Sequence, residues 1–432
     1  MSLIWPGENY LKPPIYNMIN FERYSLENGL KVILHKDETT PMVTVNVLYD
    51  VGSRDEQPDK TGFAHLFEHL MFGGTPRFPD YDKIAQAAGA TNNAFTSNDL
   101  TNYYISLPAA NLETGLMLEA DRMGGLLFSP ESLEVQRKVV IEEFKQRYLN
   151  KPYGDVWLEI SPLAYQVHSY AWQTIGKKVE HIQDVTLNDV KAFFAKHYNP
   201  QNAVLSISGN IDIKTVKSLV NKWFGGVSSG IAYQRKLQSE PPKTQKQTLK
   251  LERDVPQNAI YKVYNMPGRN SAGFYSGDLL SDLIGRGLSS RIYKELVSDK
   301  RLFTTAGASV TGNFDPGLFI VSGMLSPGVD FDKAENALDK IIDDVKNGEI
   351  LDSELEKIKN KVESTFLFNN INHSDIAFHL VWFELMGNAG NINKEVNRYR
   401  EVKKEDLRSF ACEYLKDNQS SVLYYTSKTP LK

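Results

Sequence analysis

One pattern of helix, turn and strand occurs in both halves of this 432-residue sequence, about 216 residues apart. In the first half, Phe194 and Tyr198 close a predicted helix that leads through Asn-Pro into a strand. In the second half, Phe410 and Tyr414 precede a predicted strand in the same way. Solenoid repeats have periods of roughly 20 to 50 residues, so a repeat of this length predicts that a whole domain is duplicated.

The segment between the two halves is rich in Ser, Gly and Pro, which favour neither helix nor central strand. We therefore expect a first domain over residues 1–225, a linker over 226–246 and a homologous second domain over 247–432. Two domains of about 200 residues are also what a chain of this length favours, because single hydrophobic cores stop growing beyond that size range.

Hydrophobic periodicity predicts the elements of the first half. Residues 24–34 and 43–49 alternate around a Thr-Thr-Pro break, which predicts a β-hairpin or meander. Apolar residues at helical spacing predict helices over 61–72, 111–123 and 130–149. Strands followed by helices, without regular βαβ alternation, favour an α+β fold. Each domain is then expected to be a mixed, largely antiparallel sheet covered by helices on one face.

Composition excludes several function classes. The 49 basic and 53 acidic residues give a formal net charge of -4, so no nucleic-acid partner is expected. No apolar run approaches the roughly 18 residues of a membrane span. Residues 1–18 lack the order of a secretory signal. We expect a soluble cytoplasmic protein, or a periplasmic or secreted one if a signal has been removed.

The chain has one cysteine, Cys412, which excludes an internal disulfide framework and any multi-cysteine metal site. A lone cysteine on a predicted helix is expected to be a small core residue. Metal chemistry in this chain must therefore use histidines and carboxylates.

The predicted helix over residues 61–72 carries His65, Glu68 and His69 on its polar face. Residues four apart lie about 40° apart around a helix of 3.6 residues per turn, so both imidazoles can reach one ion. Glu68 shares that face and can approach a water molecule without being a ligand. Zinc lowers the pKa of bound water to about 7, and a carboxylate can take its proton. The pattern therefore predicts a zinc-dependent hydrolase of peptide bonds, with Glu68 as the catalytic base, although a solvated helix face could carry the same residues.

The order His65-Leu-Phe-Glu68-His69, followed by Gly73-Gly74-Thr75, resembles the pitrilysin (M16) family of inverted HxxEH zinc peptidases. Within it, the sequence is most similar to the processing-peptidase-like branch, from Tyr24 to the C-terminus. The resemblance implies a metalloendopeptidase with two similar α/β-sandwich domains in each chain. It also implies that a second such chain closes a chamber around peptide substrates.

In that family the third zinc ligand is a glutamate some 75 residues downstream, in a helix with an apolar pair. The match here is Val139-Val140-Ile141-Glu142-Glu143. The alignment selects Glu143, and Glu142 stays an alternative because spacing alone does not separate them. The implied site is thus one Zn²⁺ per chain on His65, His69 and Glu143. Family members usually have another acidic residue two turns earlier, where this chain has Gln136, which adds no charge.

Residues 88–96 resemble the edge strand to which the family adds an extended peptide substrate. Main-chain pairing along such an edge accepts many sequences, so the resemblance implies that Asn93, Ala94 and Phe95 bind substrate. The alternative is an ordinary edge strand without a ligand.

Members of the family also carry an Arg and a Tyr, seven residues apart, that grip the substrate from a C-terminal domain. The aligned positions here are Val297 and Thr304, which cannot replace them. A homologous partner subunit carrying the Arg/Tyr pair is therefore expected, with a self-sufficient homodimer as the alternative. The same fold could also serve as a non-catalytic structural subunit, or as a peptide-binding module that keeps zinc.

Overall fold

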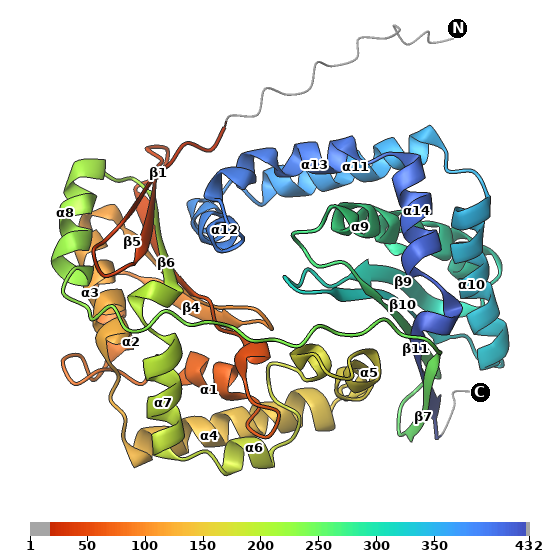
Figure 1. Ribbon diagram of the computed structural model, residues 1–432, viewed down its shortest axis with the longest axis horizontal. Helices are drawn as coiled ribbons and strands as arrows, with labels where there is room; N and C mark the ends of the chain where they lie inside the picture. Colours follow the sequence, from red (N-terminus) through yellow and green to blue (C-terminus); the bar gives the residue numbers. More distant parts are fainter. Residues whose placement is uncertain (1–17, 429–432) are drawn as a thin grey trace, which may run out of the picture.

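Two β-sheets organise residues 18–428, the part of the chain that this computed structural model describes (Figure 1). The interpretation of the N-terminal segment as lacking a secretory signal therefore falls almost wholly outside the described residues. The first sheet takes its strands from the first half of the chain and the second sheet from the second half. In Figure 1 the two sheets and their helices form two lobes beside each other.

The first half supplies a six-stranded sheet within residues 18–428, in the order β1-β2-β6-β3-β5-β4. Its strands are β1 (Glu22–Ser25), β2 (Lys31–Lys36), β3 (Met42–Tyr49), β4 (Thr91–Thr96), β5 (Thr101–Pro108) and β6 (Ala203–Gly209). Its helices are α1 (Phe63–Leu70), α2 (Tyr81–Ala87), α3 (Leu112–Gly124), α4 (Pro130–Phe144), α5 (Val156–Ala164), α6 (Glu180–Gln183), α7 (Leu187–His197) and α8 (Ile213–Phe224). The predicted helices over 61–72 and 111–123 are α1 and α3. The third is α4, which the π-helical turn Lys145–Leu149 continues.

The second half supplies a five-stranded sheet within the same described range, in the order β7-β11-β8-β10-β9. Its strands are β7 (Gln247–Arg253), β8 (Ala259–Met266), β9 (Phe303–Val310), β10 (Gly317–Leu325) and β11 (Ser420–Ser427). Its helices are α9 (Ala272–Gly285), α10 (Phe331–Asn347), α11 (Asp352–Phe368), α12 (His373–Leu385), α13 (Glu395–Glu401) and α14 (Lys404–Tyr414).

The two sheets share one topology once the edge strand β1 is set aside. In each, the last strand enters the sheet beside the first, parallel to it, and antiparallel to the second. These are β6 in the first sheet and β11 in the second, and a helix precedes each of them, α7 and α14. Every other pairing is antiparallel. The predicted α+β fold of two similar halves with mixed, largely antiparallel sheets is therefore confirmed.

The predicted hairpin or meander through residues 24–49 is wrong in its pairing. β2 pairs with β1 on one side, but β6 lies between β2 and β3. All seven residues of β6 are buried, so burial favours a central place in the sheet for this strand. A turn signal between β2 and β3 does not decide which strands pair, because the pairing depends on a segment about 160 residues later.

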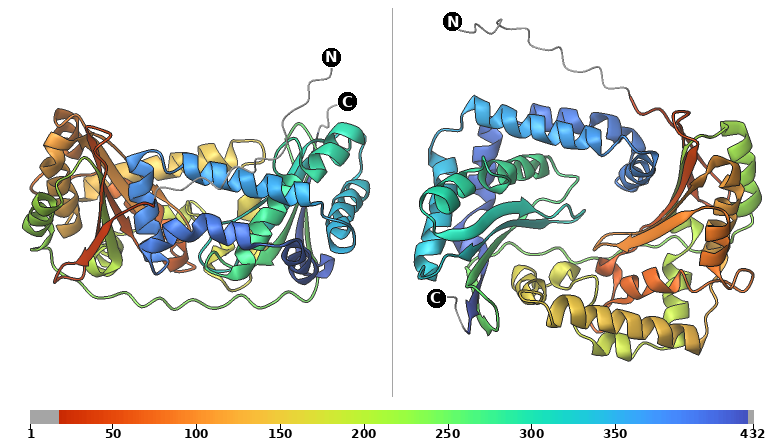
Figure 2. Two further views of the ribbon diagram at one scale, coloured as in Figure 1. Left: turned by 90° about the horizontal axis from the view of Figure 1, so that it is seen from above. Right: turned by 180° about the vertical axis from the view of Figure 1, so that it is seen from behind.

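One helix from each half packs on the sheet of the other half. α12 packs on β3 and β6, where Leu380 and Val381 join Leu48 and Val204 in one buried cluster. α5 packs in the same way on β11 of the second sheet (Figure 1, Figure 2). The expectation that helices cover one face is therefore wrong for both sheets, as the first sheet illustrates. α3 contacts β3 and β5 in the other core cluster of this sheet, so the helix that covers the second face is α12, from the other half.

Residues 228–244 have no regular secondary structure and run between the two sheets as an extended segment (Figure 1). Within residues 18–428, no helix combines the length and the apolar character that crossing a bilayer requires. Cys412 lies on α14 but is exposed, so its prediction as a core residue is wrong.

Candidate functional site

The helix α1 presents one apolar and one polar face. Phe63, Leu66, Phe67 and Leu70 are buried against the core of the first half, as the 3.6-residue period predicts. The helix begins after Gly62, whose φ of 92° lies in the left-handed region that glycine adopts without strain. The opposite face carries His65, Glu68 and His69.

The long helix α4 lies against α1. It begins at a conventional cap, because the hydroxyl of Ser129 accepts a hydrogen bond from the amide of Ser132 at 3.1 Å, and Pro130 occupies the first helical position. The last turn of α4 brings Glu143 to the polar face of α1. The two elements that the sequence predicts to share a site are therefore neighbours.

The side chains of His65, His69 and Glu143 converge. Oε2 of Glu143 lies 3.6 Å from Nε2 of His65 and 3.4 Å from Nε2 of His69. The two imidazole rings are 4.9 Å apart between centroids and nearly perpendicular, at 89°. One potential ligand atom from each of the three residues lies within 4.8 Å of the others, which is the separation that ligands of a single ion have.

The electrostatics of this cluster favour a cation. Burial lowers the pKa of His65 to about 4, so its ring is neutral near pH 7, which ligation of a metal requires. The neighbouring His69 is the main group that lowers the pKa of Glu143 and keeps this side chain a carboxylate. Two imidazoles and one carboxylate are a ligand set that zinc takes in hydrolytic enzymes, with a fourth position left open. The residues present therefore fit the zinc ion that the sequence motif implies.

Glu68 is half-buried on the same helix face. Burial raises the pKa of Glu68, and the charges of His69 and Glu143 also act on this carboxyl group. A raised pKa brings a carboxylate closer to the range in which it exchanges protons effectively with water near neutral pH. The helix α1 that carries Glu68 also contacts β4, at one edge of the first sheet.

The strand β4 lies at one edge of the first sheet, opposite β1, and pairs only with β5 within the described residues. Asn93 and Phe95 are exposed on it, whereas Ala94 is buried. The amide of Ala94 donates to Oδ1 of Asn93 at 2.8 Å. The ring of Phe95 packs edge-on against Phe378 of α12, with centroids 5.3 Å apart. The outer side of β4 therefore has no strand partner within the described residues, and an aromatic pair lies at one end of it.

The structure separates the two glutamates that spacing alone left open. Glu142 points away from the cluster, with an exposed side chain that pairs with Lys145 at 2.7 Å. Glu143 is the one that faces the two histidines. Gln136, two turns earlier on α4, is half-buried and lies outside the cluster.

The positions aligned with the family's Arg/Tyr pair lie in the second half. Val297 packs partly buried against the core there. Thr304 is exposed at the start of β9, and its hydroxyl donates to Oε1 of Gln257 at 3.1 Å. Neither side chain can place a hydrogen-bond donor as far from the backbone as an arginine or a tyrosine can.

Sequence reasoning missed two residues that contact Glu143 or the helix α1. Arg147 lies 2.8 Å from Oε1 of Glu143, an ion pair that the i,i+4 spacing on one helix could have indicated. Glu56 accepts hydrogen bonds from amides at the start of α1, but no local pattern links a loop carboxylate to a helix that begins seven residues later.

Comparisons with known proteins identify the family of this chain. Residues 31–175 match the family described as Insulinase (Peptidase family M16), and residues 184–362 match the Peptidase M16 inactive domain. The zinc protease PqqE of Helicobacter pylori is 31% identical over 409 residues, which cover 93% of this chain and 92% of that protein. This chain belongs to the M16 family of peptidases. The uncharacterized zinc protease YmxG of Bacillus subtilis is 24% identical over 81% of this M16 chain and 84% of its own length.

Solved structures share the fold along nearly the whole M16 chain. The crystal structure of a protease from Helicobacter pylori matches with a TM-score of 0.88 and 31% identity, over 94% of this chain and 99% of that one. A structure described as the peptidase M16 inactive domain from Pseudomonas fluorescens matches with a TM-score of 0.84 at 19% identity, over 96% and 99%. Because the sequence identity of the second match is only 19%, that match shows a common fold and nothing further.

Proposed function

We propose that this M16 chain is a zinc-dependent endopeptidase subunit of the inverted HxxEH, processing-peptidase-like type. His65, His69 and Glu143 would hold one zinc ion in each chain. Glu68 would act as the general base, and β4 would hold the substrate. The expected products are shorter peptides from extended or unfolded polypeptides, because only an extended chain can pair with a strand edge.

One observation supports this function most strongly: two imidazole nitrogens and one carboxylate oxygen meet within 4.8 Å, although 73 residues separate His69 from Glu143 in the sequence. Burial keeps His65 neutral, and Glu143 is a carboxylate, so no proton has to leave these two groups before a metal binds. The relatives named zinc proteases have the same family membership, which supports zinc over other divalent metals.

A zinc ion held by these ligands would supply Lewis acidity to a peptide carbonyl and to water. Glu68 can accept a proton from water at its carboxylate and return that proton to the leaving amine. Because Glu68 is half-buried, fewer other water molecules can reach its carboxyl group. The raised pKa of Glu68 suits both proton transfers.

Along β4, Asn93, Ala94 and Phe95 would hold the substrate as an added antiparallel or parallel strand. The amide of Ala94 is occupied by the side chain of Asn93, so a substrate that pairs there must first turn Asn93 aside. Phe95 and Phe378 would then contact substrate side chains on one face of the added strand.

We further propose that the active unit is a heterodimer. Val297 and Thr304 occupy the positions where the family's substrate-binding Arg and Tyr are expected. Valine has no side-chain hydrogen-bond donor, and the hydroxyl of threonine lies on a much shorter side chain than that of tyrosine. A homologous partner chain would supply that pair across the chamber. The alternative is a homodimer that works without the pair.

The test is zinc analysis and peptide hydrolysis on the purified chain, on His69→Ala and on the control His35→Ala. His35 lies on β2 and contacts the carbonyl of Asn20, away from the cluster. We expect the parent and His35→Ala to hold one zinc, and His69→Ala to lose both zinc and chelator-sensitive hydrolysis. Undiminished zinc in His69→Ala would exclude the proposed site, and a zinc-free parent would favour a non-catalytic subunit.

A further inference from the structure

The start of α1 is held by a side chain from outside the helix. Gly62 stands at the N-cap and has no side chain to offer. Instead, Oε2 of Glu56 accepts a hydrogen bond from the amide of Gly62 at 2.9 Å, and Oε1 accepts one from the amide of Ala64 at 2.8 Å. The first amides of a helix lack partners within it and form the positive end of its dipole, so a carboxylate there stabilises the first turn.

Glu56 is itself fixed in place. Its side chain is 7% exposed, and Nε1 of Trp172 donates to Oε2 at 3.0 Å. The same indole nitrogen lies 2.9 Å from the carbonyl oxygen of Ser53. Trp172 is 5% exposed, so water cannot easily replace these bonds. The carboxyl group of Glu56 thus has three N–H donors and little freedom to move.

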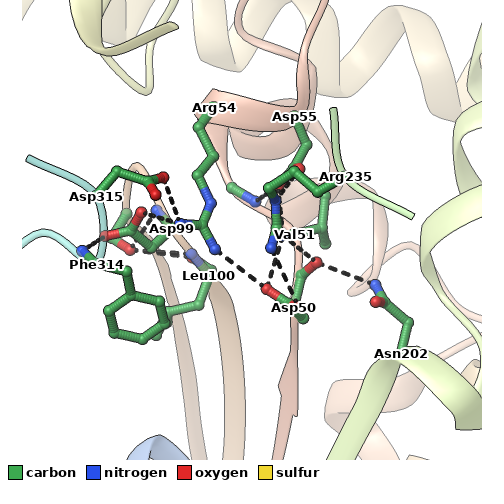
Figure 3. A network of polar contacts seen from close by, with 12 residues as sticks. Asp50, Val51, Arg54, Asp55, Asp99, Leu100, Asn202, Arg235, Phe314 and Asp315 are labelled. Carbon is green, nitrogen blue, oxygen red and sulfur yellow. Dashed lines mark hydrogen bonds and ion pairs between the residues drawn. The ribbon is translucent and has the colours of Figure 1, made fainter. Parts of the chain in front are cut away.

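The turn that carries Glu56 is anchored on two further sides (Figure 3). Arg54 pairs with Asp315, in the loop between β9 and β10, at 2.9 Å. Nε of Arg235, from the extended segment between the sheets, lies 2.6 Å from Oδ1 of Asp55. The Ser53–Glu56 turn is therefore tied to the second half and to the connecting segment, as well as to α1.

We propose that Glu56 is a positioning residue that keeps the first turn of α1 formed, so that His65 faces Glu143. The role rests on the function proposed above. α1 has eight residues, and a helix this short is marginal without tertiary support. His65 lies in its first turn and His69 in its second. Fraying at the start would therefore displace His65 and leave His69 in place.

Glu56→Gln tests this role, because an amide replaces one acceptor oxygen by a donor that faces N–H groups. Glu384→Gln is the matched control. Glu384 is 4% exposed on α12, accepts from the amide of Ala389 at 3.1 Å, and pairs with Arg23 away from the cluster. Two quantities are measured: amide hydrogen exchange of α1 in chelator-treated protein, and zinc affinity by competition with a chelator.

In Glu56→Gln we expect exchange in α1 to rise about 3- to 30-fold, the range that loss of a helix cap produces. Zinc affinity should fall about 10- to 100-fold, as it does when groups that orient metal ligands are removed. Exchange in the second sheet should not change, and Glu384→Gln should resemble the parent in both measurements. Unchanged α1 exchange and zinc affinity in folded Glu56→Gln, or equal effects in Glu384→Gln, would overturn the role.

Trp172→Phe provides a second variant if Glu56→Gln does not fold. It removes one of the three donors to Glu56 and keeps an aromatic ring in the core. Smaller changes in the same direction are expected, and none at all would overturn the role. The exchange measurement needs no zinc, so it decides the role of Glu56 even if the parent binds no metal and the proposed function fails.

Discussion

A guanidinium nitrogen of Arg54 lies 2.9 Å from a carboxylate oxygen of Asp315, although the two residues are 261 positions apart in the sequence (Figure 3). Arg54 is 4% exposed, and its guanidinium also lies 2.9 Å from Asp99 and over the ring of Phe314. The pair joins the turn before α1 to the loop between β9 and β10. It is therefore one of the contacts that fix the second half against the first.

Asp315→Asn should make the protein less stable at neutral pH, and this loss should disappear in acid. Burial opposes ionisation of Asp315, but the hydrogen bond from His168 and the charge of Arg54 lower its pKa to about 2. The folded pKa lies below the ordinary value of about 3.9. The contribution of Asp315 is therefore present above about pH 4 and is lost as the pH falls through 2.

The measurement is thermal unfolding of parent and Asp315→Asn from pH 7 to 2, with chelator present so that metal does not contribute. A gap in melting temperature that persists undiminished at pH 2 would contradict the prediction.

Glu143→Gln should lose zinc, whereas Glu142→Gln should keep it. The amide of glutamine cannot replace an anionic ligand, and Glu143 is the residue that faces both histidines. Glu142 differs by one position and points to Lys145, so it controls for charge and helix position. Elemental analysis of both variants after dialysis decides between them, and equal zinc contents would show that the ligand assignment is wrong.

Glu68→Gln should keep its zinc and its fold while peptide hydrolysis falls at least about 100-fold, the usual loss when a general base is removed. Glutamine has nearly the same shape but cannot accept a proton from water. Hydrolysis of a mixed peptide substrate is compared at equal zinc content, and circular dichroism checks the fold. If the zinc-loaded variant hydrolyses peptides as fast as the parent, Glu68 is not the base.

The isolated chain should bind zinc but hydrolyse peptides poorly, and a homologous chain with the Arg/Tyr pair should restore the rate. Donors to a developing oxyanion are often worth about 3 to 4 kcal/mol, a rate factor of roughly 100 to 1,000. Activity is measured for the chain alone and after co-expression with sister chains from the same genome. Full activity from a homodimer would exclude a required partner.

Lys262→Met should destabilise the second half by up to about 3 kcal/mol, because removing one partner of a buried ion pair leaves uncompensated charge. Lys262 is fully buried, and its Nζ donates to Glu335, Asp339 and Asp417 at 2.6 to 2.8 Å. Lys246→Met is the control, since Lys246 reaches two of the same carboxylates from a more exposed position. Urea unfolding measures both, and equal losses would contradict the argument from burial.

Local sequence patterns predicted much of the fold. The period of 3.6 residues located α1 and α3, and the Ser-Pro cap located the start of α4. The resemblance to M16 peptidases is confirmed at the level of the family, and the duplication is confirmed by the common topology of the two sheets. The zinc ligands, the catalytic base, the substrate strand and the partner stay predictions.

The sequence by itself determined that His65, Glu68 and His69 share one helix face, because helix geometry fixes the relation between residues three and four apart. Only the tertiary structure decided that Glu143 faces them, that α12 covers the first sheet, and that Glu56 holds the start of α1. Each of these depends on segments far apart in the chain. Periodicity shows that a face is apolar or polar, but what lies against that face is set by how all the buried surfaces pack together.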